Sequence, residues 1–215
     1  RGRIRIKPMS RPAYVSLSAV QAARKLALAG LLLAGLAAFA LTRSMVLGHD
    51  THELVEGIGL GLLLICILGR VWCSLYIGGR KLRELIDNGP YSMVRNPLYV
   101  FSIIGAVGVG AQSGSIVLAA VCGGMAWIAF DILVRREEAA LLVVHGETYA
   151  EYMMRVPRFM PNPGLWWDRD VLPVQPVRVM RTFADGLIFL LAIPIAEGLE
   201  HLQTVHLLPV LANLP

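Results

Sequence analysis

Two polar segments interrupt an otherwise apolar chain, and they carry side chains suited to binding a charged ligand. The first, "GPYSMVRNPLYV" at residues 89–100, contains an arginine, two tyrosines and turn-forming residues, and is called the hinge below. The second, "REEAALLVVHGETYAEYMMRVPRFMP" at residues 136–161, begins just before the pair Glu137 and Glu138. Because carboxylates and guanidinium groups form charge-assisted hydrogen bonds with ligand groups of opposite charge, these two segments are candidates for one binding site.

Each segment also has a simpler interpretation. Alone, the hinge could be an ordinary turn between helices, and the two glutamates could form a solvated helix face beside Arg135 and Arg136, which contributes little to stability. If the helices joined at residues 112–115 run antiparallel, however, one glutamate faces the hinge. We assign this role to Glu137, because the next residue along a helix points about 100° away.

The composition indicates a membrane protein. Of the 215 residues, 56% are hydrophobic and only 16% are charged, whereas a soluble domain usually carries about 25% charged residues. Apolar runs at residues 26–47, 54–77 and 115–134 each approach the roughly 20 residues that cross a bilayer core. A shorter run at residues 98–112 spans about 22 Å as a helix.

A fifth apolar run, at residues 183–196, either crosses the membrane or lies along its interface, and the pattern leaves both possibilities open. We therefore predict an all-α integral membrane protein of about five transmembrane or membrane-embedded helices. The whole chain, residues 1–215, is expected to form a single domain with a small cytoplasmic cap. The apolar C-terminal segment covers residues 182–215.

The positive charge alternates along the chain in a way that predicts its orientation. Basic residues are frequent in residues 1–25 and follow the apolar runs at residues 54–77 and 115–134. The turns at residues 48–53 and 112–115 contain no Lys or Arg. This positive-inside pattern places the N-terminus, the hinge and the segment after residue 135 in the cytoplasm. The net charge of +5 is thus interpreted as orientation and contact with membrane lipid, not nucleic-acid binding. We expect a bacterial inner membrane.

The local sequence predicts how the two polar segments fold. Asn88, Gly89 and Pro90 are expected to end a helix that contains "RKLREL", and Pro97 to begin the next helix. After residue 135 the helix continues to Gly146, a second helix covers "ETYAEYMMRV", and "VPRFMPNP" returns in extended form.

The two segments together resemble the isoprenylcysteine carboxyl methyltransferases and their relatives, the phospholipid N-methyltransferases. Those families share a Glu-Glu pair, a Gly-Glu-x-Tyr-x-x-Tyr run and a following Val-Pro, all present here between Glu137 and Pro157. The hinge resembles their Gly-x-Tyr-x-x-x-Arg-His-Pro-x-Tyr motif. The resemblance covers residues 82–161 with both halves in the expected order, and is specific for the superfamily but not for a substrate.

The resemblance implies S-adenosylmethionine as cofactor and methyl transfer to a lipophilic small molecule or lipid in the membrane. No metal is implied. Carried over by position, it implies these cofactor-binding residues: Leu85, Ile86, Tyr91, Asn96, Pro97, Leu98, Tyr99 and Glu137. A carboxylate suits the cofactor's ammonium, a cation its carboxylate, and apolar or aromatic side chains its adenine. Arg95, Arg135 and Arg136 are candidates for orienting the substrate.

The chain departs from the family pattern at two positions. Asn96 stands where the family has histidine, and since an amide does not titrate near neutrality, no base is assigned there. Leu133 stands where eukaryotic members carry an arginine implicated in holding the substrate carboxylate. This second departure argues against prenylcysteine as the acceptor.

Several other polar residues admit a structural interpretation. Arg70 lies inside the second apolar run and is expected to pair with Asp131, because an unpaired charge is costly in the membrane; a role in a substrate channel is the alternative. "HDTHE" at residues 49–53 and "EGLEH" at residues 197–201 could bind a metal on the non-cytoplasmic side, although solvated loop ends are the favoured interpretation. The three cysteines are expected to pack in helices, and Trp166 and Trp167 to anchor at the membrane interface.

Two other functional classes compete with a methyltransferase. Membrane reductases of similar architecture bind NADPH in a comparable cytoplasmic cap, and a non-catalytic protein could retain the fold. The sequence leaves the oligomeric state and the identity of the acceptor open.

Overall fold

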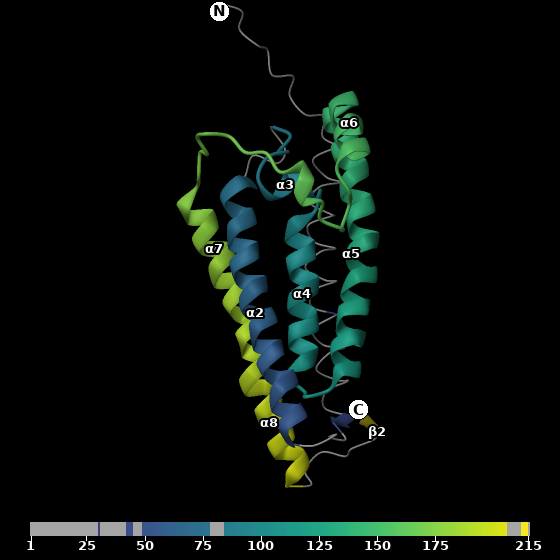
Figure 1. The fold of residues 1–215 in the computed structure, drawn as a ribbon, viewed down its shortest axis with the longest axis vertical. Coiled ribbons are helices and arrows are strands. Elements are labelled where there is room, and N and C mark those ends of the chain that lie inside the picture. The colour runs from purple at the N-terminus through teal and green to yellow at the C-terminus, as the bar shows by residue number, and fades with distance from the viewer. Residues whose placement is uncertain (1–29, 31–41, 45–48, 78–83, 206–211, 215) are drawn as a thin grey trace, which may run out of the picture.

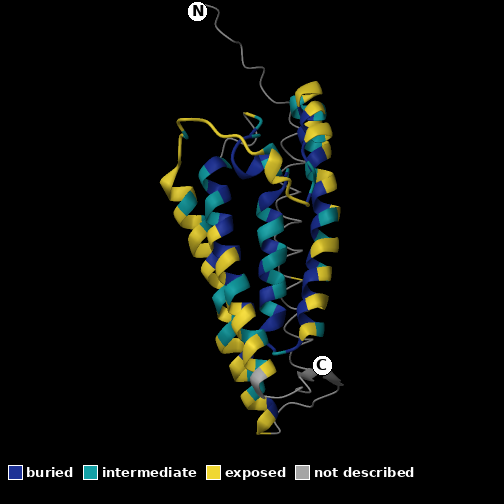
Figure 2. Cartoon of the chain, in the orientation of Figure 1, coloured by how far each residue is buried: buried dark blue, intermediate teal, exposed yellow. Residues whose placement is uncertain are grey.

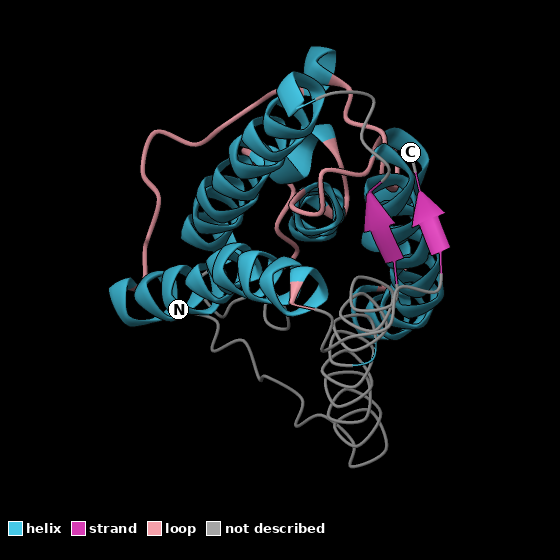
Figure 3. Ribbon diagram, turned by 90° about the horizontal axis from the view of Figure 1, so that it is seen from below, coloured by secondary structure: helices cyan, strands magenta, loops and turns pink. Residues whose placement is uncertain are grey.

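The structure is a computed structural model that describes residues 30, 42–44, 49–77, 84–205 and 212–214. Most of the predicted helix at residues 26–47 lies outside these residues. Within it, Gly30 is helical, whereas Thr42–Ser44 forms the short strand β1 and pairs in parallel with β2 (Ala212–Leu214). Helix was thus wrongly predicted at Thr42–Ser44, where the backbone pairs with a segment far along the chain. Figure 3 shows the two strands beside the helices.

Three helices form the centre of the molecule: α2 (His49–Ile77), α4 (Pro97–Ala111) and α5 (Ile116–His145). Helix α4 lies between the other two, and α4 and α5 run antiparallel (Figure 1). Their turn is closed by Gly114, whose φ of 67° suits glycine, and by Ser115, whose hydroxyl accepts a hydrogen bond from the Leu118 amide. The helices predicted over these apolar runs are confirmed.

A C-terminal helical rod runs along α2. It consists of α7 (Pro176–Leu187), a 3₁₀ turn η2 (Ile188–Leu191) and α8 (Ala192–Thr204). Pro194 lacks a backbone donor, which accounts for the tightened turn before it. Over Pro176–Thr204 the rod is long and apolar enough to cross a membrane, as are Thr51–Ile77 and Ile116–His145. The fifth apolar run therefore belongs to a helix with the dimensions of a membrane span.

Short elements cover the hinge end of the bundle. They are α3 (Pro90–Met93), α6 (Glu147–Arg155) and a 3₁₀ turn η1 (Pro163–Leu165). Gly146 ends α5 with a φ of 58°, and Pro97 begins α4, as predicted. The prediction that a helix continues to Asn88 is wrong, because residues 84–88 are not helical. There the backbone is held by the segment after α6 instead, since the Gly89 amide donates to the Trp167 carbonyl at 2.9 Å.

The burial pattern is that of a membrane protein whose outer face is apolar (Figure 2). Large exposed side chains such as Leu68 on α2, Ile128 on α5 and Ile188 on η2 face outward, where lipid tails favour them. Inside, Tyr99 of α4 packs with Phe130, Leu133 and Val134 of α5 and with Phe159. The integral, helical architecture predicted from the sequence is confirmed, with one small strand pair added.

Candidate functional site

The hinge is fixed by the segment that follows α6. The Arg95 amide donates to the Pro157 carbonyl at 2.9 Å, and the Asn162 amide donates to the Met93 carbonyl at 3.0 Å. From α6 itself, the Tyr152 hydroxyl donates to the Tyr91 carbonyl at 2.7 Å. The two polar segments singled out in the sequence therefore form one structural unit, and neither is a free turn.

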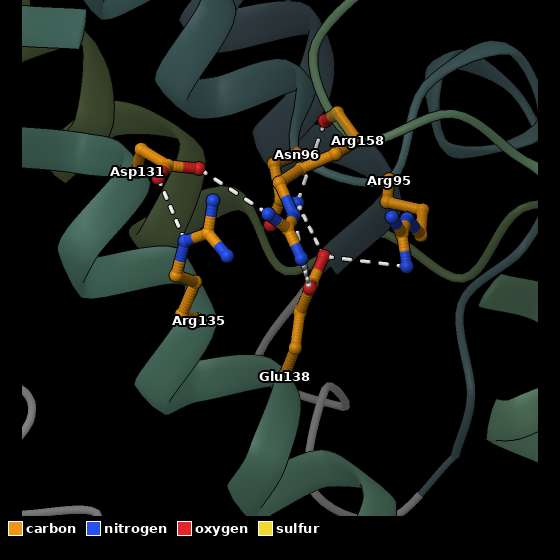
Figure 4. A network of polar contacts seen from close by, with 6 residues as sticks. All are labelled: Arg95, Asn96, Asp131, Arg135, Glu138 and Arg158. Carbon is orange, nitrogen blue, oxygen red and sulfur yellow. Dashed lines mark hydrogen bonds and ion pairs between the residues drawn. The ribbon is translucent and has the colours of Figure 1, made fainter. Parts of the chain in front are cut away.

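Glu138 is the buried centre of this unit. Its carboxylate is 4% exposed and accepts from the Nη2 (2.8 Å) and Nε (3.1 Å) atoms of Arg158. Asn96 Nδ2 donates to the other oxygen at 3.3 Å, and Arg95 Nη1 lies 3.5 Å from it. Figure 4 shows the three side chains converging on Glu138 from the hinge and from the segment after α6. A buried carboxylate requires such pairing, since breaking it would leave an uncompensated charge.

Glu137, the preceding residue on α5, also contacts the hinge, but from a different face of the helix. It is half-buried, and its Oε2 accepts from the Tyr99 hydroxyl at 3.0 Å. The expectation that Glu138 points away from the hinge was wrong, because Asn96 contacts Glu138 and Tyr99, about one turn further along, contacts Glu137. The 100° separation therefore leaves both glutamates in contact with the hinge and α4.

A small pocket opens beside this network. Its lining joins the end of α2, the non-helical residues before the hinge, the hinge, α5 and α6: Ile77, Leu85, Ile86, Tyr91, Arg95, Asn96, Leu141, Tyr149 and Tyr152. The lining is given for the described part of the chain, which omits residues 78–83. The pocket measures about 20 Å³, enough for a water molecule but not for a nucleoside. A larger ligand would require the surrounding side chains to move.

Arg95 points to the kind of ligand that the pocket would accept. Its side chain is only 10% exposed, and its Nε and Nη1 atoms make no hydrogen bond with any described residue. Buried donors without partners are costly and uncommon. A cation that lines a pocket and retains unused donors is suited to a carboxylate or another anion.

Two tyrosines of α6 form the opposite wall of the pocket. Burial raises the pKa of Tyr149, and the charge of Glu138 adds to the effect. Burial likewise raises the pKa of Tyr152, whose hydroxyl is held by the Tyr91 carbonyl. The hydrogen bond to Glu138, together with its charge, raises the pKa of Arg158 despite partial burial. At neutral pH Tyr149 and Tyr152 are therefore uncharged, and Arg158 is charged.

The predicted cofactor-binding residues divide into two groups. Leu85, Ile86, Tyr91 and Asn96 line the pocket. Pro97 and Tyr99 are buried in the helix packing, Leu98 packs against the cluster around Tyr76, and Glu137 accepts a hydrogen bond from Tyr99; these four do not line it. Of the arginines proposed to orient a substrate, only Arg95 lines the pocket.

The other two arginines lie elsewhere. Arg135 and Arg136 are exposed, and Arg135 pairs with Asp131 one helical turn away at 2.7 Å. The sequence interpretation missed Tyr149, Tyr152 and Arg158. All three stand inside the quoted family-like run, so that the motif itself carried the signal that could have identified them.

The predicted pair of Arg70 with Asp131 is wrong. Arg70 Nη1 donates to Ser102 Oγ on α4 at 2.5 Å, and its guanidinium lies 5.8 Å from the ring centroid of Phe189. Asp131 is held by Arg135 and by Arg158, whose Nη1 lies 3.3 Å away. The buried cation is thus stabilised by a hydroxyl and an aromatic face, and the acidic residue belongs to the network around Glu138.

Comparison with known proteins places the chain among methyltransferases. The family model of the phospholipid methyltransferases matches residues 60–148. The nickel-cobalt-cadmium resistance protein NccN of Alcaligenes xylosoxydans xylosoxydans is 34% identical over 178 residues, which is 80% of this chain and 83% of NccN. The cobalt-zinc-cadmium resistance protein CzcN of Cupriavidus metallidurans is 33% identical over 153 residues, 68% of this chain and 70% of CzcN.

A shorter similarity joins the chain to an enzyme of the family inferred from the motifs. The protein-S-isoprenylcysteine O-methyltransferase of Schizosaccharomyces pombe is 32% identical over 77 residues, 36% of this chain and 33% of the yeast protein. No solved structure matches the chain. The motifs, the helical bundle and the relatives agree: the chain belongs to the superfamily of integral membrane methyltransferases that includes the isoprenylcysteine carboxyl and phospholipid methyltransferases.

Proposed function

We propose that the protein transfers a methyl group from S-adenosylmethionine to a lipophilic acceptor at the cytoplasmic face of the membrane. Membership of a methyltransferase family supports the reaction class. The site supports the donor, because a zwitterionic amino acid group needs both a cation and a carboxylate. Beside the hinge, the positive charge comes from Arg95 and the negative charge from Glu137 and Glu138.

The unused donors of Arg95 carry this proposal. They lie at the pocket and suit the carboxylate of the cofactor, while Tyr91, Tyr149 and Ile86 give aromatic and apolar cover for its adenosine. For the cofactor's ammonium we assign Glu137, because both oxygens of Glu138 are engaged by Arg158, Asn96 and Arg95. Glu138 then acts as the fixed anion that orients Arg95.

The chemistry requires alignment and exclusion of water more than it requires a reactive side chain. The acceptor's lone pair attacks the sulfonium methyl while the carbon–sulfur bond breaks, which leaves S-adenosylhomocysteine. Asn96, where the family has histidine, donates to Glu138, so its amide serves the network and does not remove a proton. Any proton that the acceptor loses must pass to solvent or to another group.

The acceptor is proposed to approach from the bilayer. The position of the substrate-binding arginine of eukaryotic relatives is Leu133, which is 4% exposed and packs in the α4–α5 core. A carboxylate of prenylcysteine would find no partner there, so we favour a lipid or another apolar molecule. The names of NccN and CzcN connect similar proteins with metal resistance, and we infer that the methylated product serves cells exposed to such ions.

Binding of S-adenosylhomocysteine to the purified full chain tests the proposal. Arg95→Gln should weaken binding 10- to 100-fold, since a charge-assisted hydrogen bond contributes about 1.5–3 kcal/mol. Arg155→Gln is the matched control, because Arg155 is exposed and pairs only with Asp87 among the interactions described; it should change binding less than about two-fold.

Titration of the same protein with NADPH tests the reductase alternative. Binding of NADPH without binding of S-adenosylhomocysteine would refute the proposed donor and favour a reductase. If neither ligand binds, the non-catalytic alternative holds. Equal effects of the two arginine substitutions would show that Arg95 does not bind the ligand.

A further inference from the structure

A second cluster of chemically competent side chains lies at the end of the bundle opposite the hinge. It joins the start of α2 to the last turns of α8, which meet at that end in Figure 1. His52 Nδ1 lies 3.5 Å from Glu56 Oε1, and His52 Nε2 lies 3.4 Å from Glu200 Oε1. One nitrogen or oxygen from each residue lies within 4.8 Å of the other two.

These residues are held in helices and are not the solvated loop ends expected from the sequence. The His52 ring packs directly on Gly114, where an added Cβ would lie 2.1 Å from His52 Cδ2. Next to it, Gln112 Nε2 donates to the Glu56 carbonyl at 3.0 Å. The α4–α5 turn therefore fixes the start of α2 and the position of its imidazole. The His52 side chain is only 18% exposed.

The charge around His52 favours a bound cation. Glu53 and Glu197 are close enough to act electrostatically on Glu56, as is Glu200. Several carboxylates gathered at one point repel one another. A divalent ion would offset that repulsion more effectively than a single imidazolium.

We propose that His52, Glu56 and Glu200 bind one divalent transition-metal ion of the zinc, cobalt and nickel class. Imidazole and carboxylate are ligands that such ions accept, whereas Mg²⁺ and Ca²⁺ prefer oxygen alone. Bonds of about 2.1 Å in tetrahedral geometry separate two ligand atoms by about 3.4 Å. One ion binds only one of the two imidazole nitrogens, and one ligand atom from each residue lies within 4.8 Å of the other two, so rotation of the side chains would bring the three atoms to that value. Water would complete the coordination.

This site is distinct from the proposed methyl-transfer site. The two lie at opposite ends of the bundle, and the positive-inside pattern of the sequence places this end outside the cytoplasm. A bound ion would join α2 to α8 and would take no part in binding S-adenosylmethionine. Loss of the metal should therefore leave cofactor binding unchanged, so the two proposals can fail separately.

Titration with Co²⁺ and Zn²⁺ tests the site. The purified full chain, freed of any polyhistidine tag and treated with a chelator, should bind one ion per chain. Co²⁺ should give the visible absorption of a low-coordinate nitrogen and oxygen site. Millimolar Mg²⁺ should not compete. His52→Gln and Glu200→Gln should each weaken binding at least ten-fold.

Two further measurements keep the result interpretable. His201→Gln, which removes an exposed histidine next to Glu200 on the same helix, should bind as the unchanged protein does. Glu200→Asp, which keeps the charge but shortens the reach, should bind with intermediate affinity. Thermal unfolding in the same detergent reports whether each variant is folded. Absence of a stoichiometric ion on the unchanged protein would refute the site, as would equal binding by the Glu200→Gln and His201→Gln variants.

Discussion

Arg158 Nη2 lies 2.8 Å from Glu138 Oε2, although the two residues are separated by twenty positions and two changes of chain direction. The pair joins α5 to the extended segment after α6, and Asn96 ties it to the hinge. A single buried carboxylate thus connects the three parts of the chain that carry the family motifs. This relationship makes the two adjacent glutamates unequal in ways that can be measured.

Glu138→Gln should destabilise the protein more than Glu137→Gln. Removing a partner from a buried ion pair costs about 3 kcal/mol or more, whereas Glu137 is half-buried and its hydrogen bond from Tyr99 contributes about 1 kcal/mol. Thermal unfolding in one detergent measures both. Glu147→Gln, at an exposed position on α6, is the control. Equal losses at Glu137 and Glu138 would contradict the buried network.

The same pair predicts strong non-additivity. Arg158→Gln alone leaves Glu138 without its main partner, so the double variant Glu138→Gln/Arg158→Gln should be less destabilised than the sum of the two single variants. We expect a coupling free energy of about 1–3 kcal/mol. Additive losses would show that the two side chains act independently. Chemical or thermal unfolding of the four proteins completes the cycle.

The helices were largely predictable from the sequence, and the reason is the membrane. Runs of apolar residues near spanning length specify α2 and α5 without reference to their neighbours, and Pro97 and Gly146 mark helix ends through their own backbone preferences. The non-helical residues 84–88 were not predictable in this way. Their conformation depends on Trp167, which approaches from a distant segment.

The site was predictable in its location but not in its orientation. Motif residues identified the hinge, and four of the proposed cofactor residues line the pocket. Which glutamate is buried depends on the rotation of α5 about its axis, which is set by Phe130 and Leu133 packing against Tyr99. Periodicity gives relative directions on a helix, not the direction of its neighbour. The partner of Arg70 was wrongly predicted for the same reason.

The tyrosine that closes the pocket should make stability fall at alkaline pH. Because burial raises the pKa of Tyr152 above its ordinary value near 10, the folded state favours the neutral phenol. That stability is fully present below pH 10 and is lost as pH rises toward the folded-state pKa. In Tyr152→Phe, the decline in melting temperature above pH 10 should be shallower. An identical alkaline decline in both proteins would contradict this assignment.

Gly89→Ala should lower stability and disturb the hinge. Gly89 has a φ of 59° and a ψ of −134°, a conformation that other residues adopt at a cost of about 1–3 kcal/mol. An added Cβ would also lie 2.1 Å from the Tyr76 ring. Gly124→Ala is the matched control, because it is helical, exposed and has nothing within 4 Å. It should be neutral or slightly stabilising in a melting experiment.

Labelling of single introduced cysteines in intact cells tests the orientation on which the proposed methyl transfer depends. The native Cys66, Cys73 and Cys122 are buried, so they should contribute little background. A cysteine replacing Asp50 should react with a membrane-impermeant maleimide from outside the cytoplasm. A cysteine replacing the exposed Glu147 should react only after the membrane is opened. Labelling at position 147 from outside would place the pocket away from the cytoplasmic supply of S-adenosylmethionine, and would contradict the proposed reaction while leaving the metal site on the cytoplasmic side.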